Sequence, residues 1–387
     1  MENFNYSIPT KIYFGKGQIA NLAAIIKEYG NKVLIVYGGG SIKKIGLYDD
    51  MIKILNDTEI SFVELSGVEP NPKIETVRKG IKLCRENNVE VVLAVGGGST
   101  IDCSKVIAAG VKYDGDAWDL VTNPGKIGEV LPIVTILTLS ATGSEMDGNA
   151  VISDMTTNQK IGTGHENMKP KASILDPEYT YSVPKNQTAA GTADIMSHIF
   201  ETYFNHTQCV DIQDSTAEGL LRACIKYGRI AIKNPKDYDA RANLMWASSL
   251  AINGLISYGT NTPWVAHPME HELSAFYDIT HGVGLAILTP HWMKYSLDDK
   301  TVSKFAQYGV NVWGIDENLE ALEIANKAIE KTAEFFKELG LPSTLREVGI
   351  EEEKLGIMSK KAMYPSLKYA FKPLDENDIL SIFKASF

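Results

Sequence analysis

Apolar positions in the first half of the chain form short, nearly continuous runs that alternate with amphipathic segments. Three such runs lie at 32–40, 89–99 and 131–145, and each ends in glycine or other small residues. Unbroken Val, Ile and Leu without alternation is typical of parallel strands that are covered on both faces. The segment 72–88 between the first two runs has helical spacing. The pattern therefore predicts repeated βαβ units.

Beyond the turn-rich segment 173–191, the apolar positions follow a different spacing. They recur every three or four residues, as amphipathic helices require, over four long segments at 192–205, 214–232, 240–256 and 318–340. We therefore expect a Rossmann-like α/β domain over residues 1–182 and an all-helical domain over residues 183–387. The length of 387 residues also favours two hydrophobic cores over one.

Composition and charge limit the classes of partner. A net charge of −10 argues against nucleic acid or an anionic membrane, because both require a basic face. The four cysteines form no CxxC pair, which is typical of reduced thiols in a cytoplasmic protein. We find neither a signal peptide nor an apolar stretch near the roughly 20 residues of a membrane helix. We expect a cytoplasmic protein with a small-molecule partner.

Glycine-rich turns follow two of the predicted strands. Gly96, Gly97 and Gly98 precede Ser99 at the start of a predicted helix, where free N–H groups and the helix dipole favour an anion. The dinucleotide fingerprint GxGxxG is absent, and tight turning alone is the alternative explanation for one such loop. A second glycine-rich loop in the same domain favours nucleotide binding.

The other loop, at 37–44, bears on the choice of nucleotide. It offers Gly38, Gly39, Gly40 and Ser41, followed by two lysines, and it contains no carboxylate. An acidic side chain near such a strand end commonly binds the ribose 2′-hydroxyl and repels a 2′-phosphate. The loop therefore favours NADP(H) over NAD(H).

Aspartate and histidine side chains with helical spacing lie in the second half of the chain. Asp194 and His198 are four residues apart, His267 and His271 repeat that spacing, and His281 follows. Residues at i and i+4 share one face of a helix. One such pair is more often a surface or capping pair. One aspartate with three histidines, however, is a donor set that suits Fe²⁺ or Zn²⁺.

With these motifs combined, the chain resembles the iron-containing (group III) alcohol dehydrogenase family over essentially its full length. The likeness is strongest to the branch of NADPH-dependent butanol dehydrogenases and aldehyde reductases. It rests on seven ordered motifs: YGGGSIKK, EPNP, VGGGSTIDCSK, TLSATGSEMDGNAVI, AGTADIMSHIFE, HPMEHELS and THGVGLAILTPH. The resemblance implies a dehydroquinate synthase-like fold and a homodimer.

The resemblance also implies roles for individual residues. The metal, Fe²⁺ or else Zn²⁺, would be bound by Asp194, His198, His267 and His281, with His271 near the nicotinamide. The implied cofactor contacts, besides the loop at 38–41, are Asn71, Gly97, Gly98, Ser99, Asp102, Thr138, Ser140, Thr142, Asn149, Lys160 and Tyr179. Ser140 and Ala141 replace an Ala-Gly pair of many NAD-using relatives, which is the one visible departure from the family's motifs.

The predicted reaction is the reversible reduction of an aldehyde by NADPH to a primary alcohol, with metal assistance at the carbonyl oxygen. His271 is the candidate proton relay, with a ribose hydroxyl or water as alternatives. A polyol dehydrogenase of the glycerol type is a second hypothesis within the same chemistry. A dehydroquinate-synthase-like lyase is a third, although residues 264–282 contain no Arg or Lys for a phosphorylated substrate. A nucleotide-binding sensor without activity is a fourth, which the full donor set disfavours.

Overall fold

The computed structural model describes residues 1–261 and 263–387. The chain divides into two compact units, and neither is continuous in sequence. The α/β unit comprises Ser7–Val183 and Pro235–Met245. The helical unit comprises Met1–Tyr6, Pro184–Asn234 and Trp246–Phe387. The periodicity of the sequence predicted an α/β part followed by a helical part. It did not predict that Met1–Tyr6 belongs to the helical unit and Pro235–Met245 to the α/β unit.

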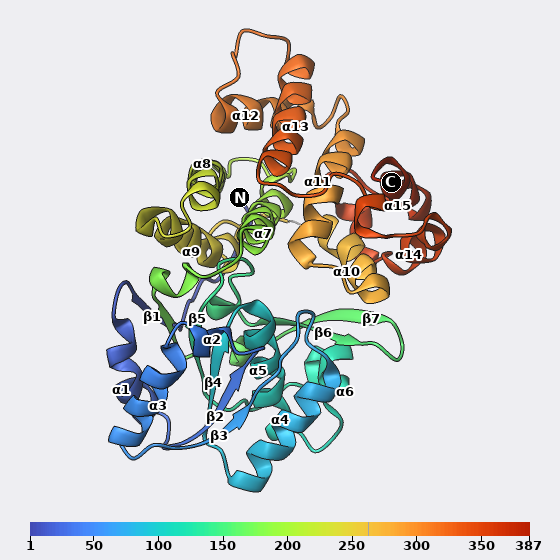
Figure 1. The fold of residues 1–387 in the computed structure, drawn as a ribbon. Helices are drawn as coiled ribbons and strands as arrows, with labels where there is room; N and C mark the ends of the chain where they lie inside the picture. The colour runs from blue at the N-terminus through green and yellow to red at the C-terminus, as the bar shows by residue number, and fades with distance from the viewer. Residues whose placement is uncertain (262) are drawn as a thin grey trace. The chain divides into compact units, whose positions relative to one another are not determined.

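The α/β unit is built on a parallel six-stranded sheet (Figure 1). In spatial order its strands are β1 (Lys11–Phe14), β8 (Ala172–Leu175), β5 (Ile133–Leu137), β4 (Val91–Gly96), β2 (Lys32–Tyr37) and β3 (Ser61–Leu65). The three predicted strands are thus confirmed as β2, β4 and β5, each ending where its run meets small residues.

Helices cover both faces of this sheet, which explains the unbroken apolar runs. Val33 and Ile35 of β2 belong to one core, while Leu34 and Val36 of the same strand belong to the other. The helices of the unit are α1 (Leu22–Lys27), α2 (Ser41–Lys44), α3 (Leu47–Asp57), α4 (Ile74–Asn87), α5 (Gly98–Val111) and α6 (Ala117–Thr122). The core with Val33 and Ile35 also holds residues of α1 and α3, and the core with Leu34 and Val36 holds residues of α4, α5 and α6.

The strand order reverses between β2 and β4. From β2 the chain continues to β3 on one side, then crosses back to β4 and β5 on the other side. Ligands of open α/β sheets bind at the carboxyl ends of the strands beside such a switch point. The glycine-rich loops after β2 and β4 flank this point.

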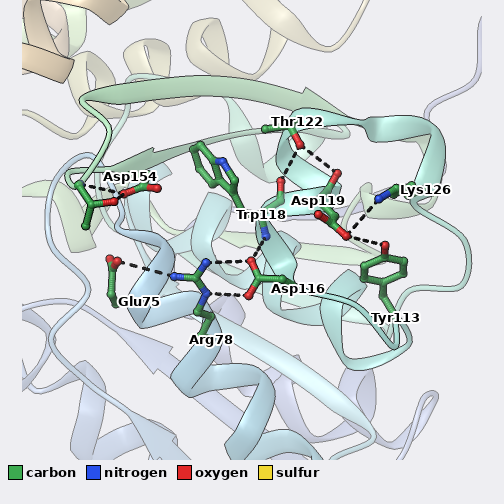
Figure 2. Close-up of polar contacts among 10 residues, drawn as sticks. Glu75, Arg78, Tyr113, Asp116, Trp118, Asp119, Thr122, Lys126 and Asp154 are labelled. Carbon is green, nitrogen blue, oxygen red and sulfur yellow. Dashed lines mark hydrogen bonds and ion pairs between the residues drawn. The ribbon is translucent and has the colours of Figure 1, made fainter.

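A two-stranded antiparallel hairpin, β6 (Asn149–Asp154) and β7 (Gln159–Gly164), was not predicted. Close to it, Arg78 of α4 donates two hydrogen bonds, of 2.8 and 2.9 Å, to the carboxylate of Asp116 (Figure 2). Asp116 also accepts from the backbone N–H of Trp118 and so caps α6. The guanidinium thereby fastens the start of α6 to α4.

The helical unit has one continuous hydrophobic core. Its α7 is buried without interruption from Thr188 to Tyr203, so this helix lies at the centre of the core. The helices after the sheet are α7 (Lys185–Tyr203), α8 (Asp211–Lys233), α9 (Tyr238–Ile252), α10 (Ala266–Tyr277), α11 (His281–Ser296), α12 (Val302–Trp313), α13 (Ala321–Glu338), α14 (Leu355–Lys361) and α15 (Glu376–Ala385). Among the described residues, no helix combines the length and hydropathy needed to span a bilayer.

Candidate metal centre and nucleotide-binding loops

The four predicted metal ligands meet around the carboxylate of Asp194. Its Oδ1 atom lies 3.8 Å from His198 Nδ1, 3.9 Å from His267 Nε2 and 3.6 Å from His281 Nε2. The donor atoms of Asp194, His267 and His281 all lie within 4.8 Å of one another. Three helices of one compact unit, α7, α10 and α11, supply the set.

Small residues bring these helices together. A Cβ atom on Gly282 would lie 2.1 Å from the carbonyl oxygen of Ala190 in α7, and one on Gly284 would lie 2.7 Å from Cγ of Glu270 in α10. Only glycine permits such approaches. The glycines of the THGVG segment therefore allow His281, at the first position of α11, to reach Asp194.

Three of the four candidate donor side chains are buried. Asp194, His198 and His267 are each less than 5 % exposed, whereas the side chain of His281 keeps 23 % of its surface exposed. Burial, with the neighbouring His267, holds the pKa of His198 well below its usual range, so its ring is neutral and has a lone pair to give. His198 Nδ1 is buried and makes no hydrogen bond within the described chain. Such an atom is costly unless a ligand satisfies it, so the residues fit a divalent cation.

Two buried carboxylates next to the histidines were missed by sequence reasoning. Glu201 of α7 contacts His267 Nδ1, and Glu270 of α10 contacts His281 Nδ1. Burial raises the pKa of Glu201 to about 7, against the lowering effect of backbone N–H groups at 265–267. The sequence offered a signal for both glutamates. Glu201 lies three residues after His198 and Glu270 lies three residues after His267, so each shares a helix face with a predicted ligand.

His271 lies at the edge of the cluster. Its ring centroid is 5.8 Å from that of His281, and its donor atom falls in a second group with those of Glu270 and His281. The ring of Trp264 lies 4.5 Å from that of His267 and 5.5 Å from that of His198. An aromatic face thus borders the donor set on the side of these two histidines.

The predicted cofactor residues gather in the α/β unit, in loops that follow neighbouring strands. Gly38, Gly39 and Gly40 follow β2, and Ser41 begins α2. Gly97 precedes α5, whose first turn holds Gly98 and Ser99. Because β2, β4 and β5 are adjacent and parallel, the segment after β5 with Thr138, Ser140 and Thr142 lies at the same sheet edge. A Cβ atom on Gly98 would lie 2.4 Å from Thr142 Oγ1, so the loop after β5 packs directly on the start of α5.

Asp102 has a structural role that the sequence did not predict. Its buried carboxylate accepts hydrogen bonds from Ser144 Oγ at 2.5 Å and from the backbone N–H of Val151 at 2.9 Å. Burial raises the pKa of Asp102 to about 6. The fully buried Lys105 donates to Ser144 Oγ at 2.8 Å and to Asp147 Oδ1 at 2.6 Å. This network ties α5 to the loop after β5 and to β6.

The remaining predicted contacts are distributed over the same unit. Asn71 is buried before α4 with φ at +49°, and Lys160 is buried in β7. Asn149 begins β6, where its side-chain amide donates to Asp147. Tyr179 packs, partly buried, against the core of the α1 and α3 face. The roles of all these residues toward a cofactor stay predictions.

The loop after β2 contains no carboxylate, as its sequence shows, but a carboxylate of the neighbouring strand bonds to the residue before the loop. Glu64 of β3 accepts a hydrogen bond from the hydroxyl of Tyr37, which precedes Gly38, at 2.7 Å, and another from Tyr48 at 2.9 Å. The Nζ atom of Lys43 lies 4.4 Å from the ring centroid of Tyr48. In the register of the sheet, Glu64 lies opposite Ile35 of β2, and it reaches Tyr37 through its side chain.

Comparison with known proteins agrees with this architecture. Residues 9–177 match the family model "Iron-containing alcohol dehydrogenase", and residues 188–387 match "Fe-containing alcohol dehydrogenase family, C-terminal". NADH-dependent butanol dehydrogenase A of Clostridium acetobutylicum is 63% identical, with all of both chains covered. The NADPH-dependent aldehyde reductase YqhD of Escherichia coli is 41% identical over 93% of each chain.

Solved structures lead to the same family. The crystal structure of NADH-dependent butanol dehydrogenase A from Thermotoga maritima superposes with a TM-score of 0.94 at 40% identity, over 100% of this chain and 99% of that one. The predicted combination of a Rossmann-like α/β part and a helical part is confirmed. The chain belongs to the iron-containing alcohol dehydrogenase family.

Proposed function

We propose that this protein is a metal-dependent, nicotinamide-linked alcohol dehydrogenase that interconverts primary alcohols, such as butanol, and their aldehydes. The observation that carries the proposal is the meeting of one aspartate and three histidines around Asp194 Oδ1. Family membership and the butanol dehydrogenase names of relatives at 63% and 61% identity support the reaction and the substrate class.

Asp194, His198, His267 and His281 would hold the divalent ion. The family favours Fe²⁺, while Zn²⁺ fits the same donors. A divalent ion there would supply Lewis-acid stabilisation of the charge that develops on the substrate oxygen. The partly exposed side chain of His281 marks the side on which a substrate oxygen can approach, because the other three donors are buried.

The protein's own side chains would handle the proton and exclude water. His271 stands one helical turn from His267 and beside His281, so we propose that it gives the substrate oxygen its proton during aldehyde reduction and removes it during alcohol oxidation. A histidine suits this exchange near neutral pH. Trp264 would limit water beside the buried donors.

The nucleotide would bind at the loops beside the switch point, where the backbone N–H groups at the start of α5 can take the pyrophosphate. NADH is the first candidate, supported by the names of relatives at 63% and 61% identity and by the nearby carboxylate of Glu64. NADPH is the second candidate, supported by Lys43 and Lys44 and by the aldehyde reductase at 41% identity.

The closing experiment is anaerobic purification and elemental analysis, followed by butanal reduction with NADH and with NADPH side by side. One ion per chain and rapid butanal reduction are the expected results. Preference for a polyol would support the glycerol-type alternative, and a metal-free protein without aldehyde reduction would overturn the proposal. The homodimer stays a prediction, which sedimentation of the same sample checks.

A further inference from the structure

We infer that Glu201 and Glu270 are positioning residues that hold the rings of His267 and His281 with Nε2 toward Asp194. The inference rests on the proposed function, because it concerns the side chains that would bind the metal. Neither glutamate is part of the donor set around Asp194 Oδ1.

Glu201 is bound to the start of α10 through both of its oxygens. Oε1 accepts from the backbone N–H of His267 at 2.9 Å and lies 3.1 Å from His267 Nδ1, and Oε2 accepts from the backbone N–H of Val265 at 2.7 Å. Both Glu201 oxygens accept from backbone N–H groups, so Nδ1 of His267 is assigned as the donor to Oε1 and its Nε2 keeps the lone pair. That Nε2 atom is the one 3.9 Å from Asp194 Oδ1.

Glu270 repeats this arrangement on the other side of the cluster. It is fully buried, contacts His281 Nδ1 through Oε2, and accepts from the hydroxyl of Ser274 through Oε1. Its position depends on Gly284, where a Cβ atom would collide with Glu270 Cγ. His281 Nε2 is thereby left 3.6 Å from Asp194 Oδ1.

The donor atoms of Glu270, His271 and His281 also lie within 4.8 Å of one another, as a second cation site would require. The contacts favour positioning instead. His281 directs Nδ1 to Glu270 and Nε2 to Asp194, so its two ring nitrogens have different partners. Carboxylate partners of this kind fix the orientation and raise the basicity of histidine ligands.

The test is zinc affinity, measured by chelator competition on full-length E201Q and E270Q. In Glu201→Gln, the amide NH₂ must face the N–H of Val265 or the N–H groups of His267. Two hydrogen-bond donors then face each other, and one hydrogen bond is lost. We expect the Zn²⁺ dissociation constant to rise 10- to 100-fold in each variant. The thermal stabilisation that Zn²⁺ gives should shrink in parallel, because that gain depends on the dissociation constant.

The matched control is E218Q in the same unit. Glu218 is also buried and accepts from Tyr203 at 2.8 Å, from Gln307 at 2.9 Å and from Asn311 at 2.9 Å, but it contacts none of the four donors. E218Q should therefore lose stability with and without zinc while its zinc affinity stays native. A milder variant, S274A, removes only the hydroxyl that orients Glu270 and should weaken zinc several-fold.

The outcomes separate this inference from the proposed function. If the unmodified protein binds one zinc ion and E201Q and E270Q bind it with the same affinity, the inference is wrong but the proposed function is not. Two ions per unmodified chain, with one lost in E270Q, would overturn the assignment of Glu270. An unmodified protein that binds no zinc would overturn the proposed function itself.

Discussion

The carbonyl oxygen of Ala190 in α7 lies 2.1 Å from the point that a Cβ atom on Gly282 in α11 would occupy. Ala190 is one turn before Asp194, and Gly282 directly follows His281. The contact between these two backbones therefore sets how closely the aspartate and the histidine approach.

A single methyl group at this contact should disrupt the metal centre. In Gly282→Ala the helices must separate, which should cost about 1–3 kcal/mol of folding free energy, as overpacking usually does. Metal content after purification should fall well below that of the unmodified protein. The matched control is Gly219→Ala in α8, where the nearest atom is 3.8 Å from the added Cβ, and it should keep full metal content. Full metal content in G282A would contradict the prediction.

Removal of His271 should separate metal binding from turnover. We expect His271→Ala to keep the metal and to lose roughly 10²- to 10⁴-fold in kcat, the usual contribution of a proton-transfer residue. Asp194→Ala and His267→Ala should both lose the metal. Elemental analysis of the three variants together with butanal kinetics checks this division. An H271A protein without metal would refute the separate roles.

Neutralising Glu64 should shift the nucleotide preference toward NADPH. The carboxylate is bound to the two tyrosines beside the loop after β2, where a negative charge disfavours a 2′-phosphate. Glu64→Gln should raise the ratio of kcat/KM for NADPH to that for NADH by roughly tenfold, about 1.4 kcal/mol. Tyr48→Phe, which removes one hydrogen bond but keeps the charge, should not raise this ratio. An unchanged ratio in E64Q would exclude an electrostatic role for this glutamate.

Loss of the buried lysine should destabilise the α/β unit strongly. Lys105 is fully buried and lies 2.6 Å from Asp147 Oδ1, so Lys105→Met leaves a buried carboxylate without its cation. The expected cost is about 3–5 kcal/mol, and the double variant K105M/D147N should recover part of it. Lys126→Gln, at the solvent-exposed pair with Asp119 in Figure 2, should change stability far less, because water screens that pair. Denaturant unfolding of the variants measures both effects.

The buried Asp102 should make the stability of the α/β unit depend on pH. Burial raises its pKa from 3.8 to about 6, so between these values the folded chain holds a proton that the unfolded chain has released. Unfolding then releases a proton, and the free energy of unfolding falls as pH rises from about 4 to about 6, by roughly 3 kcal/mol at most. Above pH 6 this contribution is constant. Asp102→Asn should remove the slope, and an equally steep slope in D102N, measured by denaturant unfolding at several pH values, would contradict the assignment.

Strong local patterns made β2, β4 and β5 predictable, whereas β1, β3 and β8 of the same sheet, and the hairpin, were not predicted. β4 and β5 are buried on both faces, so nearly every residue is apolar and the runs are evident. In β6 and β7, by contrast, burial involves few apolar residues, and polar residues such as Lys160 and Thr163 are also buried. Such strands are defined by tertiary packing rather than by a hydrophobic run.

Spacing in the sequence identified candidate ligands but not the carboxylates behind them. His271 has the same spacing to His267 as His198 has to Asp194, so only the resemblance separated it from the ligands. Glu270 and Glu272 are both buried, yet Glu270 meets His281 whereas Glu272 lies 3.6 Å from Lys361. The three-residue spacing from His267 favours Glu270 over Glu272, but the contact with His281 depends on how α10 packs against α11, which no local pattern encodes.

Every donor around Asp194, and both glutamates behind the histidines, belong to the helical unit, whereas the predicted nucleotide loops belong to the α/β unit. The proposed residues for coenzyme binding and for cation binding therefore belong to separate units. The segment from Tyr37 to Glu64 can be exchanged for that of a relative that uses NADPH instead of NADH, or the reverse. Such an exchange leaves every candidate cation-binding side chain in place. Cation loading then measures whether the helical unit of such a hybrid has folded, independently of the exchanged segment.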